Sequence, residues 1–164
     1  MKQVQSEKFC YVYDTQIGQI TIASNGDAIT MVCFGNTAGE NPCRCELTDR
    51  TAAEIQEYLS GNRTQFNLPI LFHGTDFQKR VWSALLSIPY GETRSYRQIA
   101  EQIGNPSACR AVGMANNKNP VAILIPCHRV IGSDGSLVGY AGGLTIKRFL
   151  LSLEKSNNAK KPRF

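Results

Sequence analysis

The segment that most constrains the fold lies between residues 75 and 117, where helix-start signals recur at short intervals. Thr75 and Ser95 each stand three residues before a glutamine, which is the spacing of a capping box at a helix N-terminus. Apolar residues recur at helical intervals after Thr75, and Gly104 is a natural stop for the helix that begins at Ser95. These signals predict two short helices before residue 105.

A third helix is predicted directly after Gly104, in the segment NPSACRAVGMANN. Asn105 would cap it, and Pro106 would take the first helical position, where an amide has no helical partner in any case. Two short helices joined by a tight turn at Gly104 form a helix-turn-helix, a common DNA-binding motif. The third helix carries small side chains around Arg110. Such a helix suits either close approach to a narrow DNA groove or tight packing inside the protein, and its spacing leaves both open.

The first part of the chain shows the pattern of strands. Residues 11–24, YVYDTQIGQITIAS, carry apolar or β-branched residues on both sides of Gly18. Asn25 and Gly26 then separate this run from AITMVCF, and an Asn-Gly dipeptide between two such runs is a strong hairpin signal. We therefore expect a small antiparallel sheet.

One helix and one extended segment complete this part. The helix is predicted over Asp49–Leu59, with Thr48 or Asp49 as its N-cap and Gly61 as its end. The segment FNLPI, which contains Pro69, is expected to be extended. The predicted fold class is therefore α/β, of the α+β kind. A small N-terminal antiparallel sheet with a helix precedes a mostly helical domain that holds a helix-turn-helix.

We place the boundary between two domains where the pattern changes, giving residues 1–74 and 75–164, with 155–164 as a flexible tail. The formal net charge of +5 is distributed unevenly. Residues 1–74 hold five Lys or Arg against eight Asp or Glu, whereas residues 75–164 hold thirteen against five. The basic second domain suits a polyanion such as DNA, although ordinary solvated charge would give the same count.

The cysteines are expected to be free thiols. The N-terminal segment MKQVQSEKFC lacks the apolar run of a signal peptide, and no stretch approaches the roughly 20 apolar residues that span a bilayer. We therefore expect a cytoplasmic protein, in which thiols stay reduced. The thiols before residue 74 and His73 could supply a zinc site, but their spacing does not require one. The six cysteines are Cys10, Cys33, Cys43, Cys45, Cys109 and Cys127.

Cys127 lies in the segment ILIPCHRVIG, where His128 and Arg129 interrupt an apolar run. We expect the apolar residues before Cys127 to form a buried strand. A cysteine in this setting could be a nucleophile, a metal ligand or a buried small hydrophobe. The polar pair argues against plain burial, because buried polar groups need partners. A turn after Pro126 would bring Cys127 and His128 to one side, and Glu154 in the last predicted helix could orient the histidine. The residues alone therefore make Cys127 a plausible nucleophile.

The segment PCHRV, preceded by NPVAILIP and followed by GYAGGLTIKRFLLSLE, resembles the O6-alkylguanine-DNA alkyltransferase family. The segments GTDFQKRVWSALLSIPYGETRSYRQIA and NPSACRAVGMANNKNP are similar to the family's helices up to and including its recognition helix and hinge. EYLSGNRTQFNLPI resembles the end of the family's N-terminal domain. The resemblance covers residues 55–154 well, and the residues before them match mainly in their strand pattern.

The resemblance implies that the helix-turn-helix of the second domain is winged-helix-like and that this domain holds an active-site cysteine. It also implies a role for each matching residue around that cysteine. Cys127 would accept an alkyl group, His128 would take the thiol proton through a water, and Glu154 would hold the histidine. Asn119 would be the hinge asparagine, bonding backbone near the helix-turn-helix to backbone near the active site. Arg129 would serve the structure of the site.

The resemblance also implies residues that bind DNA and the damaged base. Arg110 would enter the duplex and fill the space of an extruded guanine. Tyr96 would contact the phosphate side and the flipped base, and Tyr140 would wall the base pocket. Ala141 and Gly142 would offer backbone contacts to the base. The implied set is Tyr96, Arg110, Ala111, Gly113, Tyr140, Ala141 and Gly142.

The implied function is DNA repair by direct reversal of O6-alkylguanine, with O4-alkylthymine as a further expected substrate. The alkyl group would pass once and irreversibly to Cys127, with no cofactor and no metal. The expected partner is double-stranded DNA bound through the minor groove, and the protein is expected to be a monomer. The alternatives are a non-catalytic alkyltransferase-like lesion binder, which would lack Cys127, and a helix-turn-helix regulator, whose recognition helix would carry longer polar side chains.

Overall fold

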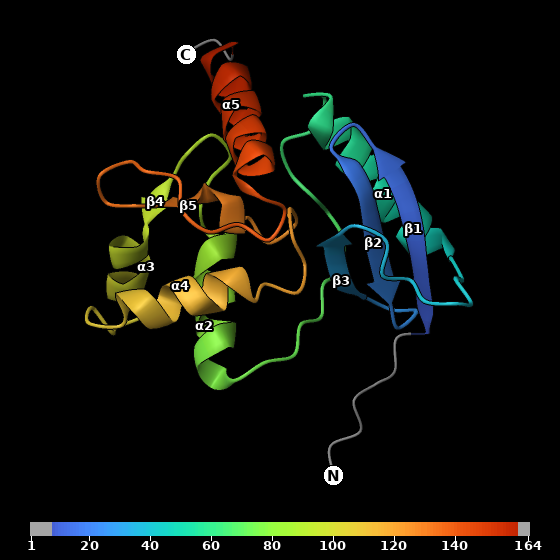
Figure 1. Ribbon diagram of the computed structural model, residues 1–164, viewed down its shortest axis with the longest axis horizontal. Helices are drawn as coiled ribbons and strands as arrows, with labels where there is room; N and C mark the ends of the chain where they lie inside the picture. Colours follow the sequence, from blue (N-terminus) through green and yellow to red (C-terminus); the bar gives the residue numbers. More distant parts are fainter. Residues whose placement is uncertain (1–7, 161–164) are drawn as a thin grey trace. The chain divides into compact units, whose positions relative to one another are not determined.

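A three-stranded antiparallel sheet begins the computed structural model, which describes residues 8–160 (Figure 1). Its strands are β1 (Phe9–Thr15), β2 (Gly18–Ser24) and β3 (Ile29–Phe34), in the spatial order β1-β2-β3. Gly18, directly after the first connecting turn, and Gly26, within the second, have φ of 100° and 105°, a region that glycine adopts without a Cβ clash. Both predicted hairpins are therefore confirmed.

The helix of this part, α1 (Glu46–Leu59), packs on the sheet and begins earlier than predicted. Cys45 is its N-cap, and the Cys45 amide donates to Thr48 Oγ1 at 3.0 Å. Thr48 is thus the third helical residue, and the prediction that Thr48 or Asp49 caps the helix was wrong. The end is as predicted, because Gly61 follows the C-cap with φ of 82°.

The chain divides into two compact units, and the first takes in a segment that the sequence placed in the second domain. Pro120–Leu124 belongs with the sheet and α1, whereas His73–Asn119 and the residues from Ile125 onward form the second unit. The Val32 amide donates to the Pro120 carbonyl at 2.9 Å, and the Val32 carbonyl accepts from the Ala122 amide at 2.9 Å. These bonds add residues 120–122 to the open edge of β3.

The apolar run before Cys127 was expected to be a buried strand. Residues 121–125 are buried, but Ile123 has φ of 71°, which a regular strand does not accommodate. The prediction of burial is confirmed and the prediction of a strand was wrong, since the chain changes direction at Ile123.

Three helices open the second unit, as predicted. The capping boxes at Thr75 and Ser95 are both present, with Gln78 and Gln98 as their partners. The last of the three helices packs against the first two (Figure 1). They are α2 (Asp76–Leu86), α3 (Tyr96–Gln102) and α4 (Cys109–Asn117).

The start of α4 differs from the prediction, because Ala108 is the N-cap. Asn105 instead begins a turn, in which the Ala108 amide donates to the Asn105 carbonyl at 3.0 Å. The Asn105 side chain accepts from Ser107 Oγ at 3.2 Å and does not cap the helix. The prediction of Asn105 as cap and Pro106 as first helical residue was therefore wrong.

Trp82 anchors the core of the second unit. It is 2% exposed, and its indole Nε1 donates to the Ala115 carbonyl on α4 at 2.8 Å. Fully burying an aliphatic or aromatic side chain of this kind contributes roughly 1.5–3 kcal/mol. Around it the buried apolar residues come from α2, α3, α4 and the last helix: Val81, Leu85, Ile99, Val112 and Leu150.

A short parallel pair joins the helices to the segment that holds Cys127. Strands β4 (Arg94–Ser95) and β5 (Val130–Ile131) pair in register Arg94 to Val130. Between them in sequence, the 3-10 turn η1 (Cys127–Arg129) leads directly into β5. β4 in turn leads directly into α3, so the helix-turn-helix and the cysteine share one small framework.

The last helix, α5 (Leu144–Lys160), is longer than predicted. Residues 155–160 are helical and not the flexible tail expected from residue 155, while residues 161–164 lie outside the described part. The extra turns have a partner on the unit itself, because Asn157 Nδ2 donates to the Tyr90 hydroxyl at 3.2 Å. The Asn158 side chain also lies against Gly91, where a Cβ would approach to 2.8 Å.

Candidate active site

Cys127 lies in a tight turn within the second unit. The Cys127 amide donates to the Ile125 carbonyl at 2.8 Å, and the Arg129 amide donates to the Pro126 carbonyl at 3.0 Å. Pro126, with its φ fixed by the ring, begins this turn. The residue is 4% exposed. The turn after Pro126 that the sequence left open is therefore present.

The thiol of Cys127 is held in its protonated form by its surroundings. Burial raises the pKa of Cys127 to about 11, against the opposing effects of the Asn119 side chain, the Lys147 ammonium and nearby backbone amides. At neutral pH such a thiol carries little thiolate, and the thiolate is the reactive form. A reaction at this sulfur therefore needs a base close by.

His128, Arg129 and Glu154 form a buried network beside Cys127. His128 Nε2 lies 2.9 Å from Glu154 Oε1. Arg129 donates to both carboxylate oxygens, from Nε to Oε2 and from Nη2 to Oε1, each at 2.9 Å. The Gly91 amide donates to Glu154 Oε2 at 3.0 Å. Arg129 Nη1 also donates to the Ile88 carbonyl at 2.6 Å. The network ties α5, η1 and the segment after α2 together.

The charges in this network define which histidine nitrogen is basic. Burial would raise the pKa of Glu154, but the hydrogen bonds from His128 and Arg129 outweigh it and hold the pKa at about 2. Burial lowers the pKa of His128, so the ring is neutral at pH 7. An ionised carboxylate only accepts hydrogen bonds, so His128 Nε2 carries the proton. Nδ1 is then the nitrogen with a lone pair, ready to accept a proton.

Two tyrosines predicted to contact the base stand near the thiol. Burial raises the pKa of Tyr140 well above its ordinary value and also raises the pKa of Tyr96, and the negative charge that Cys127 carries as a thiolate adds to both shifts. The Tyr140 ring lies edge-on to His128 with centroids 6.5 Å apart. The Tyr96 hydroxyl donates to the Val138 carbonyl at 3.0 Å. Both hydroxyls therefore stay protonated and can donate hydrogen bonds.

Two asparagines at the end of α4 hold the backbone around Cys127. Asn119 Nδ2 donates to the Ile125 carbonyl at 2.8 Å, which is the bond to backbone near the active site that was expected of it. Asn116 Nδ2 donates to the Cys127 carbonyl at 3.3 Å, and sequence reasoning missed this residue. A polar residue in helical phase with the buried Val112 was the available signal.

Lys147 is the second residue that sequence reasoning missed. It is fully buried, and its ammonium donates to the carbonyls of Val130 at 2.6 Å, Val138 at 3.0 Å and Gly139 at 3.4 Å. Burial lowers the pKa of Lys147, whereas the negative charge that Cys127 carries as a thiolate raises it. The ammonium thus joins the loop before α5 to β5 and places a positive charge near the thiol. Its helical phase with Leu150 and Glu154 was the available signal.

Helix α4, with its small side chains, is packed inside the unit on one face and exposed on the other. Val112 and Ala115 are buried in the unit, whereas Arg110 and Ala111 are exposed. Gly113 faces the Tyr96 ring, where a Cβ would lie 3.8 Å away. Small residues therefore allow close packing on one side and a smooth exposed surface on the other.

The loop after Tyr140 presents backbone near the same site. The Gly143 amide donates to the Tyr140 carbonyl at 2.9 Å and closes a turn over the intervening residues. Ala141 is exposed and Gly142 is partly exposed, so their backbone groups are accessible. Tyr96 and Tyr140 thus lie near Cys127, and His128 is its neighbour in the chain. Glu154 reaches the site through its bond to His128, and Ala141 and Gly142 follow Tyr140 directly.

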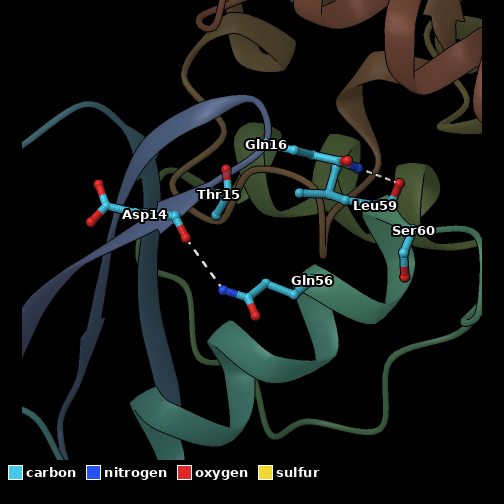
Figure 2. Close-up of a pocket in the computed structure, with 6 residues that line it drawn as sticks. All are labelled: Asp14, Thr15, Gln16, Gln56, Leu59 and Ser60. Carbon is cyan, nitrogen blue, oxygen red and sulfur yellow. Dashed lines mark hydrogen bonds between the residues drawn. The ribbon is translucent and has the colours of Figure 1, made fainter.

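Residues 8–160 contain no cluster of three or more His, Cys, Asp or Glu that could hold a metal ion. Figure 2 shows a pocket of about 340 Å³ in the first unit, at the end of β1 and the last turn of α1. Gln56 Nε2 donates to the Asp14 carbonyl at 3.3 Å there, and Gln16 donates to the Leu59 carbonyl. These amides fasten the β1–β2 turn to α1, which is a structural role.

No helix in the described part of the chain is long and apolar enough to span a membrane.

Two family models match consecutive parts of the chain. The model described as 6-O-methylguanine DNA methyltransferase, ribonuclease-like domain, matches residues 8–72. The model described as 6-O-methylguanine DNA methyltransferase, DNA binding domain, matches residues 76–156. Together they cover most of the described residues.

Known proteins similar to this chain agree with these models. The methylated-DNA--protein-cysteine methyltransferase of Mycobacterium tuberculosis is 50% identical over 149 residues, covering 87% of this chain and 90% of that protein. The protein of the same name from Methanosarcina barkeri is 49% identical over 152 residues, covering 89% and 96%. The crystal structure of Mycobacterium tuberculosis OGT in complex with DNA aligns with a TM-score of 0.84 and 46% identity, covering 91% of this chain and 94% of that one.

Proposed function

Because the chain belongs to the 6-O-methylguanine DNA methyltransferase family, we propose that Cys127 is the residue that accepts the alkyl group from damaged DNA. The protein binds DNA and repairs it by alkyl transfer. The observation that carries the assignment of Cys127 is its position one residue before His128, whose ring is oriented by Glu154 at 2.9 Å. This arrangement supplies a base, and an orienter for that base, to a buried thiol.

The proton of Cys127 moves toward His128 as the sulfur reacts. Nδ1 of the neutral imidazole accepts it, through one bridging water. The imidazolium that forms is stabilised by the Glu154 carboxylate, which stays ionised because Arg129 holds its pKa at about 2 together with His128. The Lys147 ammonium stabilises the developing thiolate from another side. The raised resting pKa of Cys127 keeps the thiol unreactive until a substrate is bound.

The transfer itself is an in-line displacement. The sulfur of Cys127 attacks the alkyl carbon and forms a C–S bond, while the bond from that carbon to O6 breaks and its electron pair stays on guanine. The guanine takes up one proton, and the thiol proton has left through His128, so charge is conserved. The product is a thioether, which thiol exchange does not reverse. Each molecule therefore acts once, with no cofactor.

The exposed side of α4 is the proposed contact to DNA, through the minor groove of the duplex. The target atom lies inside the base stack, so the base must be extruded at a cost of a few kcal/mol. Arg110, which is exposed on α4, fills the space that the base leaves. The small Ala111 and Gly113 allow the helix backbone to approach the groove closely. Tyr96 borders both α4 and the thiol and contacts the flipped base and its phosphate.

The base pocket is completed by the segment before α5. Tyr140 walls the pocket, and the backbone of Ala141 and Gly142 bonds the guanine edge. O6-alkylguanine is the proposed principal lesion and O4-alkylthymine a further one. The protein acts as a monomer in the cytoplasm, where a reducing environment preserves the acceptor thiol.

The alternative functions are not favoured. A non-catalytic lesion binder has no use for Cys127 with its oriented histidine, and a transcription regulator would leave the buried network without a purpose. The exposed face of α4 also has few long polar side chains with which to read bases.

A labelled-substrate experiment tests the assignment of Cys127. A duplex with radiolabelled O6-methylguanine is incubated with the protein, and the label is mapped by peptide mass. We expect stoichiometric label on the peptide that contains Cys127. Cys127→Ala should abolish transfer, and the matched control Cys109→Ala, on α4, should transfer as wild type does. Label on another residue, or transfer by Cys127→Ala, would contradict the proposal.

A further inference from the structure

Two cysteines of the first unit lie directly opposite each other on neighbouring backbone segments. The Cys10 amide donates to the Cys43 carbonyl at 2.7 Å, and the Cys43 amide donates to the Cys10 carbonyl at 2.9 Å. The two residues form an isolated antiparallel bridge on the outer edge of β1, whose other edge pairs with β2 through Cys10 and Ala23 (Figure 1). The sequence alone predicted only unpaired thiols here.

This pairing places the two side chains within reach of one another. Residues that exchange both backbone hydrogen bonds across an antiparallel pair have Cα atoms about 5.5 Å apart, and their side chains lie on the same face. Disulfides most often join cysteines whose Cα atoms are roughly 5.5–6 Å apart. The Cβ atoms of such a hydrogen-bonded pair lie up to about 5.5 Å apart, against about 3.5–4.5 Å in a disulfide. A bond between the two sulfurs therefore needs side-chain rotation and a shift of the Cys43 segment toward β1 of about 1 Å.

The remaining thiols are placed differently. Cys45 caps α1 through a contact from the Thr48 amide, and Cys33 Sγ lies 3.2 Å from Thr37 Oγ1. Cys127 is 4% exposed, whereas Cys43 is exposed and Cys10 is partly exposed. Within residues 8–160, Cys10 and Cys43 lie in no group of three or more His, Cys, Asp or Glu that could hold a metal ion.

We propose that Cys10 and Cys43 are a modification site that forms a reversible disulfide by exchange with a small-molecule disulfide such as glutathione disulfide. The exposed sulfur of Cys43 attacks glutathione disulfide, forming a mixed disulfide and releasing one glutathione thiolate. The sulfur of Cys10 then attacks Cys43 and releases the second glutathione. The two cysteines are oxidised by two electrons, glutathione disulfide is reduced to two glutathiones, and the two cysteine protons pass to them.

The disulfide would join the segment between β3 and α1 covalently to β1. That segment is held at its start, where the Gly35 amide donates to the Gln19 carbonyl at 2.7 Å and the Thr37 amide donates to Thr21 Oγ1 at 2.9 Å. Its end is held by the two bonds between Cys10 and Cys43. A covalent link at this end fastens the segment at both sides.

The acceptor thiol is spared under the same conditions. Burial leaves Cys127 out of reach of a solvent disulfide, and it raises the pKa of Cys127 to about 11, so little thiolate is present to attack one. The exposed pair therefore reacts with the oxidant first. The protein keeps its acceptor while it takes up a disulfide that glutathione can later remove.

The test is incubation of the full chain with glutathione disulfide, followed by blocking of free thiols and peptide mapping without reduction. We expect the intact mass to fall by two hydrogen atoms and a cross-linked peptide to join Cys10 to Cys43, with Cys127 blocked as a free thiol. Cys10→Ser should instead carry one glutathione on Cys43. Cys45→Ser is the matched control and should form the same cross-link, because serine also caps a helix.

Three results would overturn the inference. These are a glutathione adduct on both cysteines of the wild-type chain, a cross-link from Cys43 to Cys45, and oxidation of Cys127 before the pair. A thermal scan adds an independent measure, since the cross-linked chain should unfold roughly 5 °C higher than the reduced chain, and the shift should vanish with reductant. Because this test follows only the thiols of the folded protein, its outcome does not depend on whether Cys127 accepts an alkyl group.

Discussion

Replacing Glu154 with glutamine should destabilise the second unit strongly while keeping the shape of the side chain. The carboxylate is 1% exposed and accepts hydrogen bonds from His128, Arg129 and Gly91. Glutamine leaves the Arg129 guanidinium buried without a counter-charge. Removing one partner of a buried ion pair costs about 3–5 kcal/mol, so we expect a loss of that size at pH 7.

The pH dependence of this loss follows from the lowered pKa of Glu154. The pKa falls from 4.5 to about 2 on folding, so ionisation of this group favours the folded state above pH 4.5. That contribution amounts to about 3 kcal/mol at pH 7, and it is lost as the pH falls through the folded pKa. At about pH 3 only about 1 kcal/mol of it remains. The difference in stability between wild type and Glu154→Gln should therefore shrink by about 2 kcal/mol between pH 7 and about pH 3.

Urea unfolding followed by the fluorescence of Trp82 measures this difference, because Trp82 is the single tryptophan and lies in the core of the same unit. Glu92→Gln is the matched control, since Glu92 pairs with Arg94 at the surface, where such a pair contributes up to about 1 kcal/mol. If Glu154→Gln is as mild as Glu92→Gln, or its deficit is the same at both pH values, the buried network does not stabilise the unit as argued.

Three further predictions concern the reaction. Lys147→Met should slow methyl transfer about tenfold in single-turnover assays, because loss of the charge raises the pKa of Cys127 by about one further unit. Lys147→Arg keeps the charge and should restore most of the rate, so equal losses in both variants would exclude a role of the charge. Burial lowers the pKa of His128, so its imidazole stays unprotonated to a lower pH than a free histidine does. The transfer rate should therefore stay constant from about pH 8 down to about pH 6, and a fall centred at about pH 6.5 or above would contradict this. Arg110→Ala should slow transfer from duplex DNA roughly tenfold or more while leaving transfer from a free alkylguanine base unchanged. Arg97→Ala removes a charge already paired with Glu101 and should change the rate on either substrate little. Equal losses on both substrates in Arg110→Ala would exclude the role of Arg110 in filling the space of the extruded base.

Local sequence signals predicted the helix starts correctly where the capping side chain has a single hydrogen-bond partner within reach. Thr75 and Ser95 cap their helices as their spacing to glutamine indicates. Asn105 does not, because Ser107 donates to its side chain and draws the chain into a turn. Cys45 was overlooked as a cap because cysteine is a rare N-cap, and its partner Thr48 looked like the better one.

The candidate site was visible in sequence only in part. Cys127, His128 and Arg129 are neighbours in the chain, so their proximity needed only a turn. Glu154 was assigned to the histidine by analogy with a triad and by family resemblance, and the structure places it 2.9 Å from His128. Lys147 went unnoticed, since its acceptors are backbone carbonyls of residues 130, 138 and 139, which no side-chain pattern reveals.

The joining of Pro120–Leu124 to the first unit was also beyond local reasoning. Residues of the second unit both precede and follow this segment in the sequence, and the two that flank it, Asn119 and Ile125, are hydrogen-bonded to each other. Its partner is the edge of β3, more than eighty residues earlier, and such pairing depends on which strand edge is left open after the sheet forms.

The central claim is that Cys127 is a single-use acceptor, and the mass of the intact protein after reaction tests it most directly. The protein is incubated with an excess of duplex DNA carrying O6-methylguanine until the reaction stops. We predict the addition of one methyl group per chain, located on Cys127, and consumption of one lesion per protein molecule. Continued repair beyond one lesion per molecule, or a chain that remains unmodified after repairing DNA, would contradict the account.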